Sequence, residues 1–194
     1  MEGCRLSVKD LACRRGDRLL FSGLDFALAP GDALQIAGPN GTGKSSLLRI
    51  VAGLLRPFAG TVERSGAVAL LDERPALDEH LPLGRAFGFW QRIDGGGFGA
   101  DQLATLGLED LLDVPVRFLS TGQRKRAAFA RLKAQDTPIW LLDEPLNGLD
   151  TAAVALLTQE TAAFCDNGGI AVIASHQPFA LPGLAQLDLF RFAL

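Results

Sequence analysis

The chain has 194 residues, of which 48% are hydrophobic and 21% are charged, and its formal net charge is −3. This length and composition suit one globular domain with a hydrophobic core and room for a small inserted subdomain. The slightly acidic balance does not provide the basic footprint of a dedicated nucleic-acid binder, so no nucleic-acid partner is expected.

The cysteines and one uncharged stretch bear on the compartment and the membrane. Cys4, Cys13 and Cys165 are far apart and have no metal-ligand spacing, which is typical of reduced thiols in a cytosolic protein. The N-terminus shows no signal segment. Residues 168–187 contain no Asp, Glu, Lys or Arg, but polar residues and two prolines interrupt them, which favours a buried strand and a loop over a membrane helix. The chain is therefore expected to be soluble, with any membrane role depending on a partner.

The first third of the chain predicts strands around a glycine-rich loop. Residues 33–37 are a short apolar run, and residues 47–55 show an apolar helical pattern that Pro57 is expected to end. Between them stands Gly38-Pro-Asn-Gly-Thr-Gly-Lys-Ser45. In a strand-loop-helix context this octapeptide predicts a phosphate-binding loop, because its glycines let backbone N–H groups point at phosphates. An ordinary glycine-rich turn is the alternative, which that context disfavours.

The loop assigns roles to individual residues. Lys44 supplies a positive charge for the β- and γ-phosphates of a nucleotide, and Ser45 supplies a hydroxyl ligand for Mg²⁺. ATP and Mg²⁺ are the expected cofactors. The residues predicted to bind the nucleotide here are Gly38, Pro39, Asn40, Gly41, Thr42, Gly43, Lys44, Ser45 and Ser46.

The middle of the chain predicts a small helical subdomain. Short strands are expected at residues 61–63 and 67–71, and residues 82–113 then mix short helical patterns with a Gly95–Gly97 turn, interpreted as a flexible linker. Four aromatic residues are expected to form the small core of this part or, alternatively, to line a groove for a helix of a membrane partner: Phe87, Phe89, Trp90 and Phe98. The predicted domain is a core of residues 1–77 and 119–194, with the helical subdomain at about 78–118.

The last third predicts alternating helices and buried strands. Helices are expected from Ser120 to about Ala134 and from about Thr151 to Phe164, and strands at residues 139–142, 170–174 and 187–192. Continuous apolar strands of this length suit a parallel sheet covered on both faces. The expected fold is α/β, and its resemblance to P-loop NTPases of the RecA-like type implies a mostly parallel sheet with an N-terminal antiparallel β portion and the inserted helices.

Three side chains near the ends of these strands are candidates for metal binding and catalysis. Asp143 ends a buried strand, where its carboxylate can hold Mg²⁺. Glu144 follows it and can orient and deprotonate an attacking water. His176, predicted to end the next strand, could donate a hydrogen bond to the γ-phosphate. Solvated carboxylates and a hydrogen-bonded core histidine are the alternatives if each residue is considered alone.

The pentapeptide Leu119-Ser-Thr-Gly-Gln123 predicts a helix start that is also an anion site. Ser120 and Gln123 have the spacing of a capping box. A helix N-terminus with a free hydroxyl and a glycine can bind phosphate as well. Because the chain's own loop already holds one nucleotide, this second site is expected to serve the nucleotide of another copy of the chain. Ser120, Gly122 and Gln123 are therefore predicted to contact ATP, and the chain to form a homodimer.

Taken in order, these motifs resemble the ABC-transporter ATPases. The phosphate loop, the pentapeptide, the acidic pair, Leu146–Asp150 and His176 carry the resemblance, which covers essentially the whole chain. It implies a two-fold dimer with two ATP molecules, each between Lys44 of one chain and Ser120 and Gly122 of the other. It also implies integral membrane permease subunits and a peripheral location at the cytoplasmic face of the inner membrane.

A narrower resemblance is to the ATP-binding subunits of bacterial haem exporters of cytochrome c maturation. Its residues are Leu20–Phe26, Gly53–Pro57 and the segment from Gly168 to Pro178. It implies that ATP hydrolysis energises haem export, while haem itself is not expected to bind this chain. The alternatives are an ABC ATPase for another substrate or, with less support, a soluble ABC ATPase that acts on DNA or ribosomes. The latter predicts a coiled-coil insertion, a tandem cassette or a basic face.

The sequence departs from the family pattern at three places. The residue that stacks on adenine is usually aromatic, and here the matching position is Arg15, whose guanidinium can also stack on a purine or belong to a solvated surface pair. Asp72-Glu73-Arg74 stands where a glutamine is expected near the metal and the attacking water. Either acid could approach Mg²⁺, and a charged surface turn is the simpler interpretation. Thr121 replaces a glycine, which leaves the anion-binding atoms of Ser120 and Gly122 in place.

Overall fold

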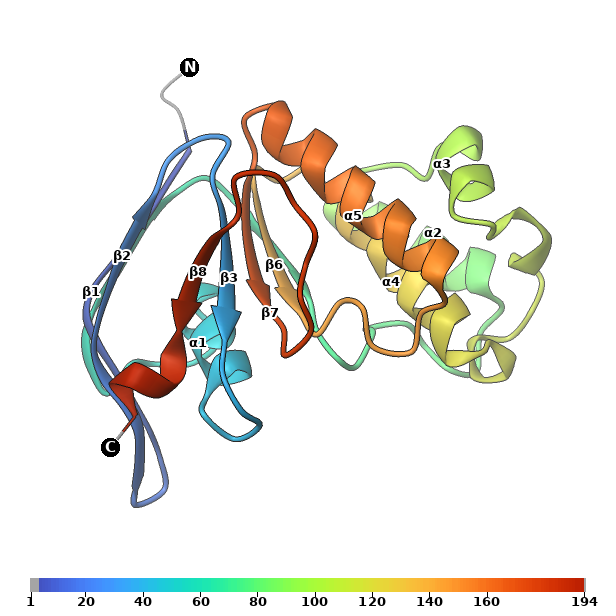
Figure 1. Ribbon diagram of the computed structural model, residues 1–194. Helices are drawn as coiled ribbons and strands as arrows, with labels where there is room; N and C mark the ends of the chain where they lie inside the picture. The colour runs from blue at the N-terminus through green and yellow to red at the C-terminus, as the bar shows by residue number, and fades with distance from the viewer. Residues whose placement is uncertain (1–3, 194) are drawn as a thin grey trace.

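The computed structural model describes residues 4–193, which form two sheets with helices between and beside them (Figure 1). Residues 1–3 and 194 of the predicted domain lie outside this range. The antiparallel sheet has the order β2-β1-β4 and the parallel sheet the order β5-β6-β7-β3-β8. The strands are β1 Arg5–Arg15, β2 Arg18–Leu28, β3 Ala33–Ala37, β4 Ala59–Ser65, β5 Val68–Leu71, β6 Ile139–Asp143, β7 Ile170–Ala174 and β8 Ala185–Asp188.

The helices lie on both faces of the parallel sheet. In Figure 1, α1 lies between the two sheets, and α2 to α5 lie on the opposite side of the parallel sheet. The α-helices are α1 Lys44–Val51, α2 Leu83–Asp94, α3 Ala100–Thr105, α4 Thr121–Ala134 and α5 Thr151–Asp166, and the 3₁₀ helices are η1 Glu109–Leu111, η2 Val116–Phe118 and η3 Leu189–Phe192. This architecture confirms the predicted α/β fold with its parallel sheet, antiparallel portion and added helices.

The parallel sheet separates two hydrophobic cores. Along β6, Ile139 and Leu141 pack with α1 and the antiparallel sheet, whereas Trp140 and Leu142 pack with the helices on the other face. Successive side chains of a strand point to opposite faces, so a strand buried on both faces needs an uninterrupted apolar run. The expectation of a sheet covered on both sides is confirmed.

The strand order brings three distant loops to one edge of the sheet. β7 lies between β6 and β3, and all of these pairings are parallel. The carboxyl ends of the three strands therefore face the same way, as parallel strands require. The glycine loop follows β3, Asp143 and Glu144 stand at the end of β6, and His176 follows β7. Topology alone thus gathers the residues that the sequence separates.

Two predicted elements need correction. Helix α1 ends at Val51 rather than continuing to Leu55, because Gly53 adopts a left-handed φ of 79° and Leu54 is 71% exposed. The predicted strand at residues 187–192 is wrong for most of its length. Strand β8 ends at Asp188, whose carboxylate accepts a hydrogen bond from the Phe190 N–H at 3.0 Å and starts the 3₁₀ helix η3.

The helical segment between β5 and α4 packs into the same hydrophobic core as α4, α5 and one face of the parallel sheet, so the predicted separate small core is not observed. Phe87 is buried and stacks on Phe98 with ring centroids 4.1 Å apart, whereas Phe89 is 46% exposed. The glycine turn is not a mere linker, because a Cβ at Gly96 would lie 1.7 Å from the carbonyl oxygen of Ala134. The close approach of this turn to the end of α4 therefore requires glycine.

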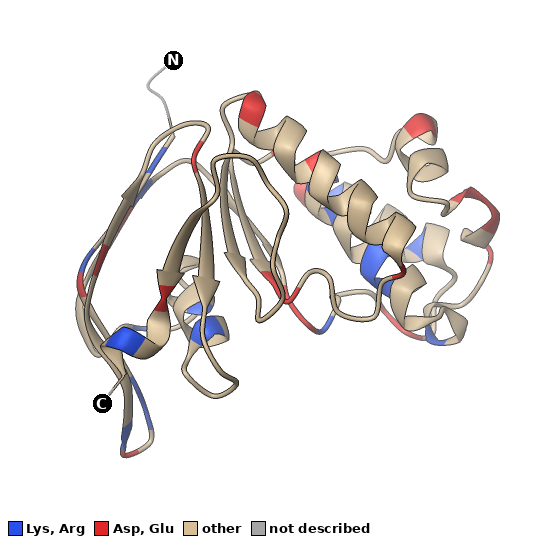
Figure 2. Cartoon of the chain, viewed as in Figure 1, with Lys and Arg blue, Asp and Glu red and all other residues tan. Residues whose placement is uncertain are grey.

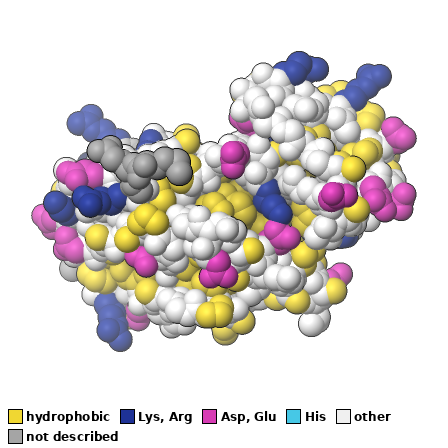
Figure 3. Space-filling model, turned by 90° about the horizontal axis from the view of Figure 1, so that it is seen from above, with side chains coloured by type: hydrophobic (Ala, Val, Ile, Leu, Met, Phe, Trp, Pro, Cys, Tyr) yellow, Lys and Arg dark blue, Asp and Glu magenta, His cyan; other side chains and the backbone are white. Residues whose placement is uncertain are grey.

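Surface charge and helix length complete the description. Figure 3 shows Lys, Arg, Asp and Glu side chains dispersed over the face seen from above. Among residues 4–193, no helix combines the length and the apolar character needed to cross a membrane.

Candidate active site

The glycine loop curls into a cradle between β3 and α1. Gly38, Gly41 and Gly43 have φ values of 144°, 83° and 105°, which other residues rarely adopt. A Cβ at Gly43 would lie 3.2 Å from the side chains of Leu20 and Phe21, so the loop also needs glycine for space. The N–H groups of the first turn of α1 have no carbonyl partner within the helix and face the end of the loop. This backbone is built to receive an anion.

Lys44 lies over the cradle. Its side chain is only 6% exposed, and its Nζ donates hydrogen bonds to the carbonyl oxygens of Gly38 at 2.8 Å and Pro39 at 3.3 Å. The ammonium is therefore held at the mouth of the loop, where phosphate oxygens can replace the carbonyls as its partners.

Ser45 and Asp143 meet although 98 positions separate them in sequence. The Ser45 hydroxyl donates a hydrogen bond of 3.0 Å to Oδ1 of Asp143, which is 4% exposed at the end of β6. A hydroxyl and a carboxylate oxygen at this separation are the hard oxygen ligands that Mg²⁺ prefers, so the donor set fits this ion. Burial raises the pKa of the Asp143 carboxyl, and the hydrogen bond from Ser45 partly opposes this shift.

Glu144 has a constrained backbone and a directed side chain. Its φ is 45°, and its N–H donates to the carbonyl oxygen of Ala174 at 2.8 Å. Its Oε2 lies 2.9 Å from Nδ1 of His176, and its Oε1 lies 3.7 Å from Nζ of Lys44. The carboxylate is 15% exposed, so it points into the space above the glycine loop while staying partly screened from solvent.

His176 lies two residues beyond β7 rather than at its last residue. The ring is 47% exposed and reaches Glu144 from the loop. The next residue, Gln177, donates through Nε2 to Oδ1 of Asn147 at 3.2 Å, which ties this loop to the segment after β6. The structure therefore brings His176, Glu144 and Lys44 together, as their predicted roles require, while the roles themselves stay predictions.

One pocket collects most of these groups. Its volume is about 430 Å³, and its lining includes Lys44 and three carboxylates. An excess of negative charge around an anion cradle is balanced when a divalent cation binds with the anion. The lining residues are Leu20, Asn40, Gly41, Gly43, Lys44, Ser45, Ser46, Glu73, Asp143, Glu144, Asn147 and His176. In Figure 2 the ribbon is red, marking acidic residues, at the carboxyl end of β6 and blue, marking basic residues, on parts of α1.

The pentapeptide lies at the start of α4, apart from this pocket. Ser120 and Gln123 form the predicted capping box: the Ser120 Oγ accepts from the Gln123 N–H at 3.2 Å, and the Gln123 Oε1 accepts from the Ser120 N–H at 2.8 Å. A Cβ at Gly122 would lie 3.2 Å from the Gly148 carbonyl oxygen. Within residues 4–193, the lining of this pocket does not include Ser120, Gly122 or Gln123.

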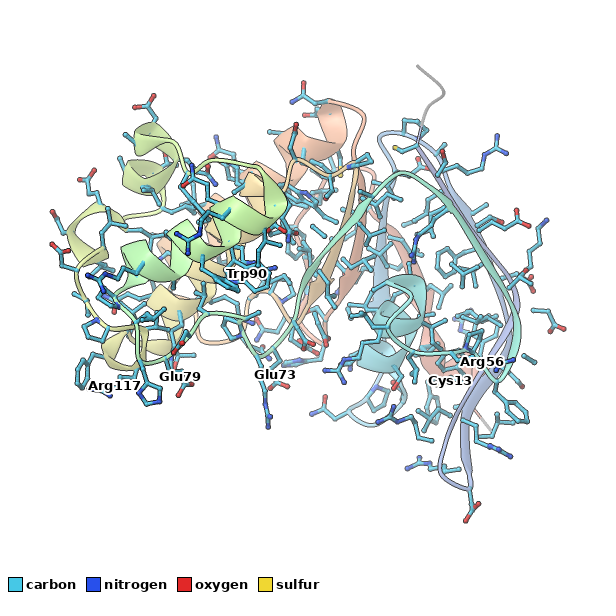
Figure 4. The ribbon with its side chains drawn as sticks, turned by 180° about the vertical axis from the view of Figure 1, so that it is seen from behind. Cys13, Arg56, Glu73, Glu79, Trp90 and Arg117 are labelled. Carbon is cyan, nitrogen blue, oxygen red and sulfur yellow. The ribbon has the colours of Figure 1, made fainter. Side chains whose placement is uncertain are left out.

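The departures from the family pattern have distinct surroundings. Arg15 ends β1, is exposed and pairs across the hairpin with Arg18, and the described lining of the pocket does not include it. Asp72 accepts hydrogen bonds from the Arg49 guanidinium at 3.0 and 3.2 Å, which makes it part of a surface ion pair. Glu73 instead lines the pocket that holds Lys44 and Glu144, and Figure 4 shows it on the segment that leads toward the helical part.

Sequence reasoning missed one buried charge. Lys125 donates through Nζ to the carbonyl oxygen of Glu144 at 3.0 Å and is 6% exposed. Its helix also buries Ala128, Phe129 and Leu132, and these residues follow it at spacings of three, four and seven. The signal that could have identified Lys125 is a lysine among the apolar residues on the buried face of an amphipathic helix.

A measurement of thermal stability can test whether the buried charge of Asp143 destabilises the fold. Asp143→Asn is expected to raise the melting temperature of the nucleotide-free protein at pH 7. A raised folded pKa means that ionised Asp143 weakens the fold as pH rises through that pKa, and asparagine avoids this cost while still accepting from Ser45. The gain should shrink as pH falls toward about 4, where aspartate becomes neutral in the unfolded chain too.

Differential scanning fluorimetry across this pH range provides the measurement. Asp113→Asn changes an exposed carboxylate and serves as the control. Its melting temperature is expected to equal that of the unchanged protein at every pH. A melting temperature of Asp143→Asn at or below that of the unchanged protein at pH 7 would contradict the prediction.

Comparison with known proteins agrees with this geometry. The ABC transporter family profile matches residues 21–147. The chain is 58% identical over 192 residues to the "Cytochrome c biogenesis ATP-binding export protein CcmA" of Novosphingobium aromaticivorans, covering 99% of both chains. The protein of the same name from Sphingopyxis alaskensis is 53% identical, with 94% of this chain and 95% of that one covered.

A solved structure shows the same fold. The structure "An inward-facing conformation of a putative metal-chelate type ABC transporter" aligns with a TM-score of 0.80 and 26% identity, covering 96% of this chain and 80% of that one. The family matches agree with the phosphate loop and with the strand order. The chain belongs to the ABC transporter ATPases and, within them, to the cytochrome c biogenesis ATP-binding export proteins.

Proposed function

We propose that this ABC ATPase hydrolyses ATP to energise a transporter that exports haem for cytochrome c biogenesis. The observation that carries the proposal is the convergence of Lys44, Asp143, Glu144 and His176 on one pocket at the carboxyl ends of parallel strands. Relatives named for ATP-binding export in cytochrome c biogenesis, up to 58% identical over nearly the full length, support the direction and the pathway.

In the proposed reaction, the chain's own residues bind and orient ATP and water. The N–H groups of the glycine loop and the Lys44 ammonium hold the phosphates. Ser45 and Asp143 would hold Mg²⁺, which neutralises charge on the phosphates when bound. The water oxygen bonds to the γ-phosphorus, the bond to the β-phosphate oxygen breaks, and the water proton passes to Glu144. The products are ADP and phosphate.

His176 would position the Glu144 carboxylate and contact the γ-phosphate. The 2.9 Å contact between Nδ1 of His176 and Oε2 of Glu144 fixes the orientation of both side chains. Because an ionised carboxylate only accepts, Nδ1 donates to it, and the other ring nitrogen can donate to a phosphate oxygen only in the imidazolium form. Lys44 lies near one oxygen of the Glu144 carboxylate and His176 near the other. Together they keep this carboxylate directed at the space above the loop.

The second half of each ATP site would come from a second copy of the chain. Ser120 is exposed at the start of α4, where its hydroxyl and N–H groups of the first turn can donate hydrogen bonds to an anion. An isologous two-fold dimer places this surface of each chain over the pocket of the other. Gln123 holds the cap in shape, and Gly122 allows the close approach of Gly148.

The membrane subunits would dock on the helical part of the molecule. Phe89 and Trp90 line an apolar pocket of about 300 Å³ with Ala76 and Leu77. The segment that supplies Ala76 and Leu77 also carries Glu73, which lines the nucleotide pocket. A short segment that borders both places can transmit nucleotide-dependent movement to a partner. In this proposal residues 78–118 are the subdomain that meets the membrane subunits, and the chain is peripheral at the cytoplasmic face of the inner membrane.

Deletion of the gene in its host tests the proposed substrate. We expect the strain to lose covalent haem from its c-type cytochromes, as measured by peroxidase staining of haem after denaturing electrophoresis. The unchanged gene should restore the stain and a Glu144→Gln copy should not. Normal c-type cytochromes in the deletion strain would rule out the haem-export proposal and leave the ATPase assignment standing.

A further inference from the structure

Lys125 is a buried cation that the proposed reaction does not use. It lies on α4, little more than one turn after the first helical residue, and its side chain is buried between that helix and the end of β6. Its Nζ donates a hydrogen bond of 3.0 Å to the carbonyl oxygen of Glu144. Lysines are almost never fully buried without a partner, because removing an ammonium from water is costly. The contact with Glu144 therefore calls for a reason beyond packing.

The peptide at Glu144 is one that needs external support. A non-glycine residue at a φ of 45° lies in the left-handed region, which is strained for residues that carry a Cβ. Such a conformation persists only where neighbouring groups determine it. The N–H of Glu144 donates to Ala174 at 2.8 Å, and its carbonyl oxygen accepts from Lys125 and from the N–H of Asn147 at 3.4 Å. Lys125 supplies the shorter of the two hydrogen bonds to this oxygen.

The charge of Lys125 matches its surroundings. Burial lowers the pKa of its ammonium, and the carboxylates of Asp143, Glu73, Glu144 and Asp72 act in the opposite direction and favour the charged form. Lys125 and Glu73 also line a second pocket of about 510 Å³ beside the nucleotide pocket. An apolar side chain of similar length could fill the same volume, but it could neither donate to Glu144 nor offset these acids.

We propose that Lys125 is a positioning residue that holds the backbone of Glu144 so that its carboxylate faces the attacking water. The inference rests on the proposed role of Glu144 as the base. Because Lys125 contacts the main chain of Glu144 rather than the phosphate loop, its loss acts on turnover and spares nucleotide binding. Lys125 also belongs to α4, the helix that Ser120 caps. The same helix therefore carries the surface that would contact the partner's ATP and the residue that holds Glu144 of its own site.

The test compares three variants of the purified protein. Lys125→Met is expected to lower kcat for ATP about 10- to 100-fold, the size of effect that a misplaced catalytic group produces. Its Kd for ATP, measured by equilibrium binding, should stay within about threefold, because Lys44 and the loop are unchanged. Lys125→Arg keeps a donor and a charge and should recover most of the lost kcat.

The control is Arg126→Met. Arg126 also donates to a main-chain carbonyl, that of Leu106 at 2.7 Å, but on the helical side away from the nucleotide pocket. We expect it to keep kcat near the unchanged value. An unaltered kcat in Lys125→Met, or a loss of ATP affinity as large as the loss of kcat, would overturn the proposal. If Lys125→Met does not fold, Lys125→Arg tests the proposal instead. A loss of kcat of about 10- to 100-fold in Lys125→Arg would then overturn the positioning role.

A double variant separates this inference from the function on which it rests. In a Glu144→Gln background, Lys125→Met should cause no further loss of the residual single-turnover rate, because both changes act on the same group. An additional tenfold loss would show that Lys125 acts elsewhere. If Glu144→Gln itself keeps full activity, the proposed base is wrong. If Glu144→Gln is inactive and Lys125→Met is fully active, only the positioning role fails.

Discussion

Glu144→Gln is expected to abolish ATP turnover while leaving ATP binding intact. Glutamine has nearly the same shape as glutamate and can keep the contact with His176, but it cannot accept the proton of the attacking water. Removal of a general base typically costs about 10²- to 10⁴-fold in rate. The Lys44 ammonium, the loop N–H groups and the Ser45–Asp143 pair remain in place, so the binding energy for ATP does not depend on this carboxylate.

Phosphate release under saturating ATP and equilibrium binding of ATP measure the two effects separately. Glu109→Gln is a matched control, because it makes the same chemical change at an exposed carboxylate on η1. It should retain both properties. Near-normal hydrolysis by Glu144→Gln would refute the assignment of Glu144 as the base, and a loss of ATP binding would show that its carboxylate serves the cradle instead.

Ser120→Arg is expected to prevent dimerisation in the presence of ATP without removing ATP from the chain's own loop. Arginine adds a long side chain where an exposed hydroxyl would meet the partner's phosphates, so the two surfaces could not close. The change also removes the cap from α4 at a cost of about 1 kcal/mol, which a stable domain tolerates. Its own nucleotide pocket is lined by other residues.

Light scattering after size exclusion with ATP detects the dimer, most clearly in a Glu144→Gln background where hydrolysis no longer reopens it. Ser120→Thr keeps both the cap and the hydroxyl, and we expect it to form the dimer. Equilibrium ATP binding by Ser120→Arg confirms that the fold survives. A Ser120→Arg protein that dimerises with ATP as the unchanged protein does would refute the role of the pentapeptide in the partner's site.

Most regular elements could be predicted because their signals are local. The strand at Ile139–Asp143 follows from a continuous apolar run, and the start of α4 follows from the capping box at Ser120, which the structure confirms. Where competing local signals lie close together the prediction was wrong. Phe190 continues an apolar pattern after Leu187, but the carboxylate of Asp188 captures its N–H and turns the chain into a 3₁₀ helix.

The sequence by itself determined which groups a nucleotide site would contain. The glycines of the phosphate loop and Lys44 depend on conformations or bonds within a few residues. The acidic pair was found because it follows directly on a continuous apolar run, which is also a local signal. Only the tertiary structure decided which of them meet. Ser45 reaches Asp143, Glu144 reaches His176 and Lys125 reaches Glu144 because β7 pairs between β3 and β6 and α4 packs behind them. Such contacts arise from burying both faces of the sheet, and that burial depends on the whole chain rather than on any one segment.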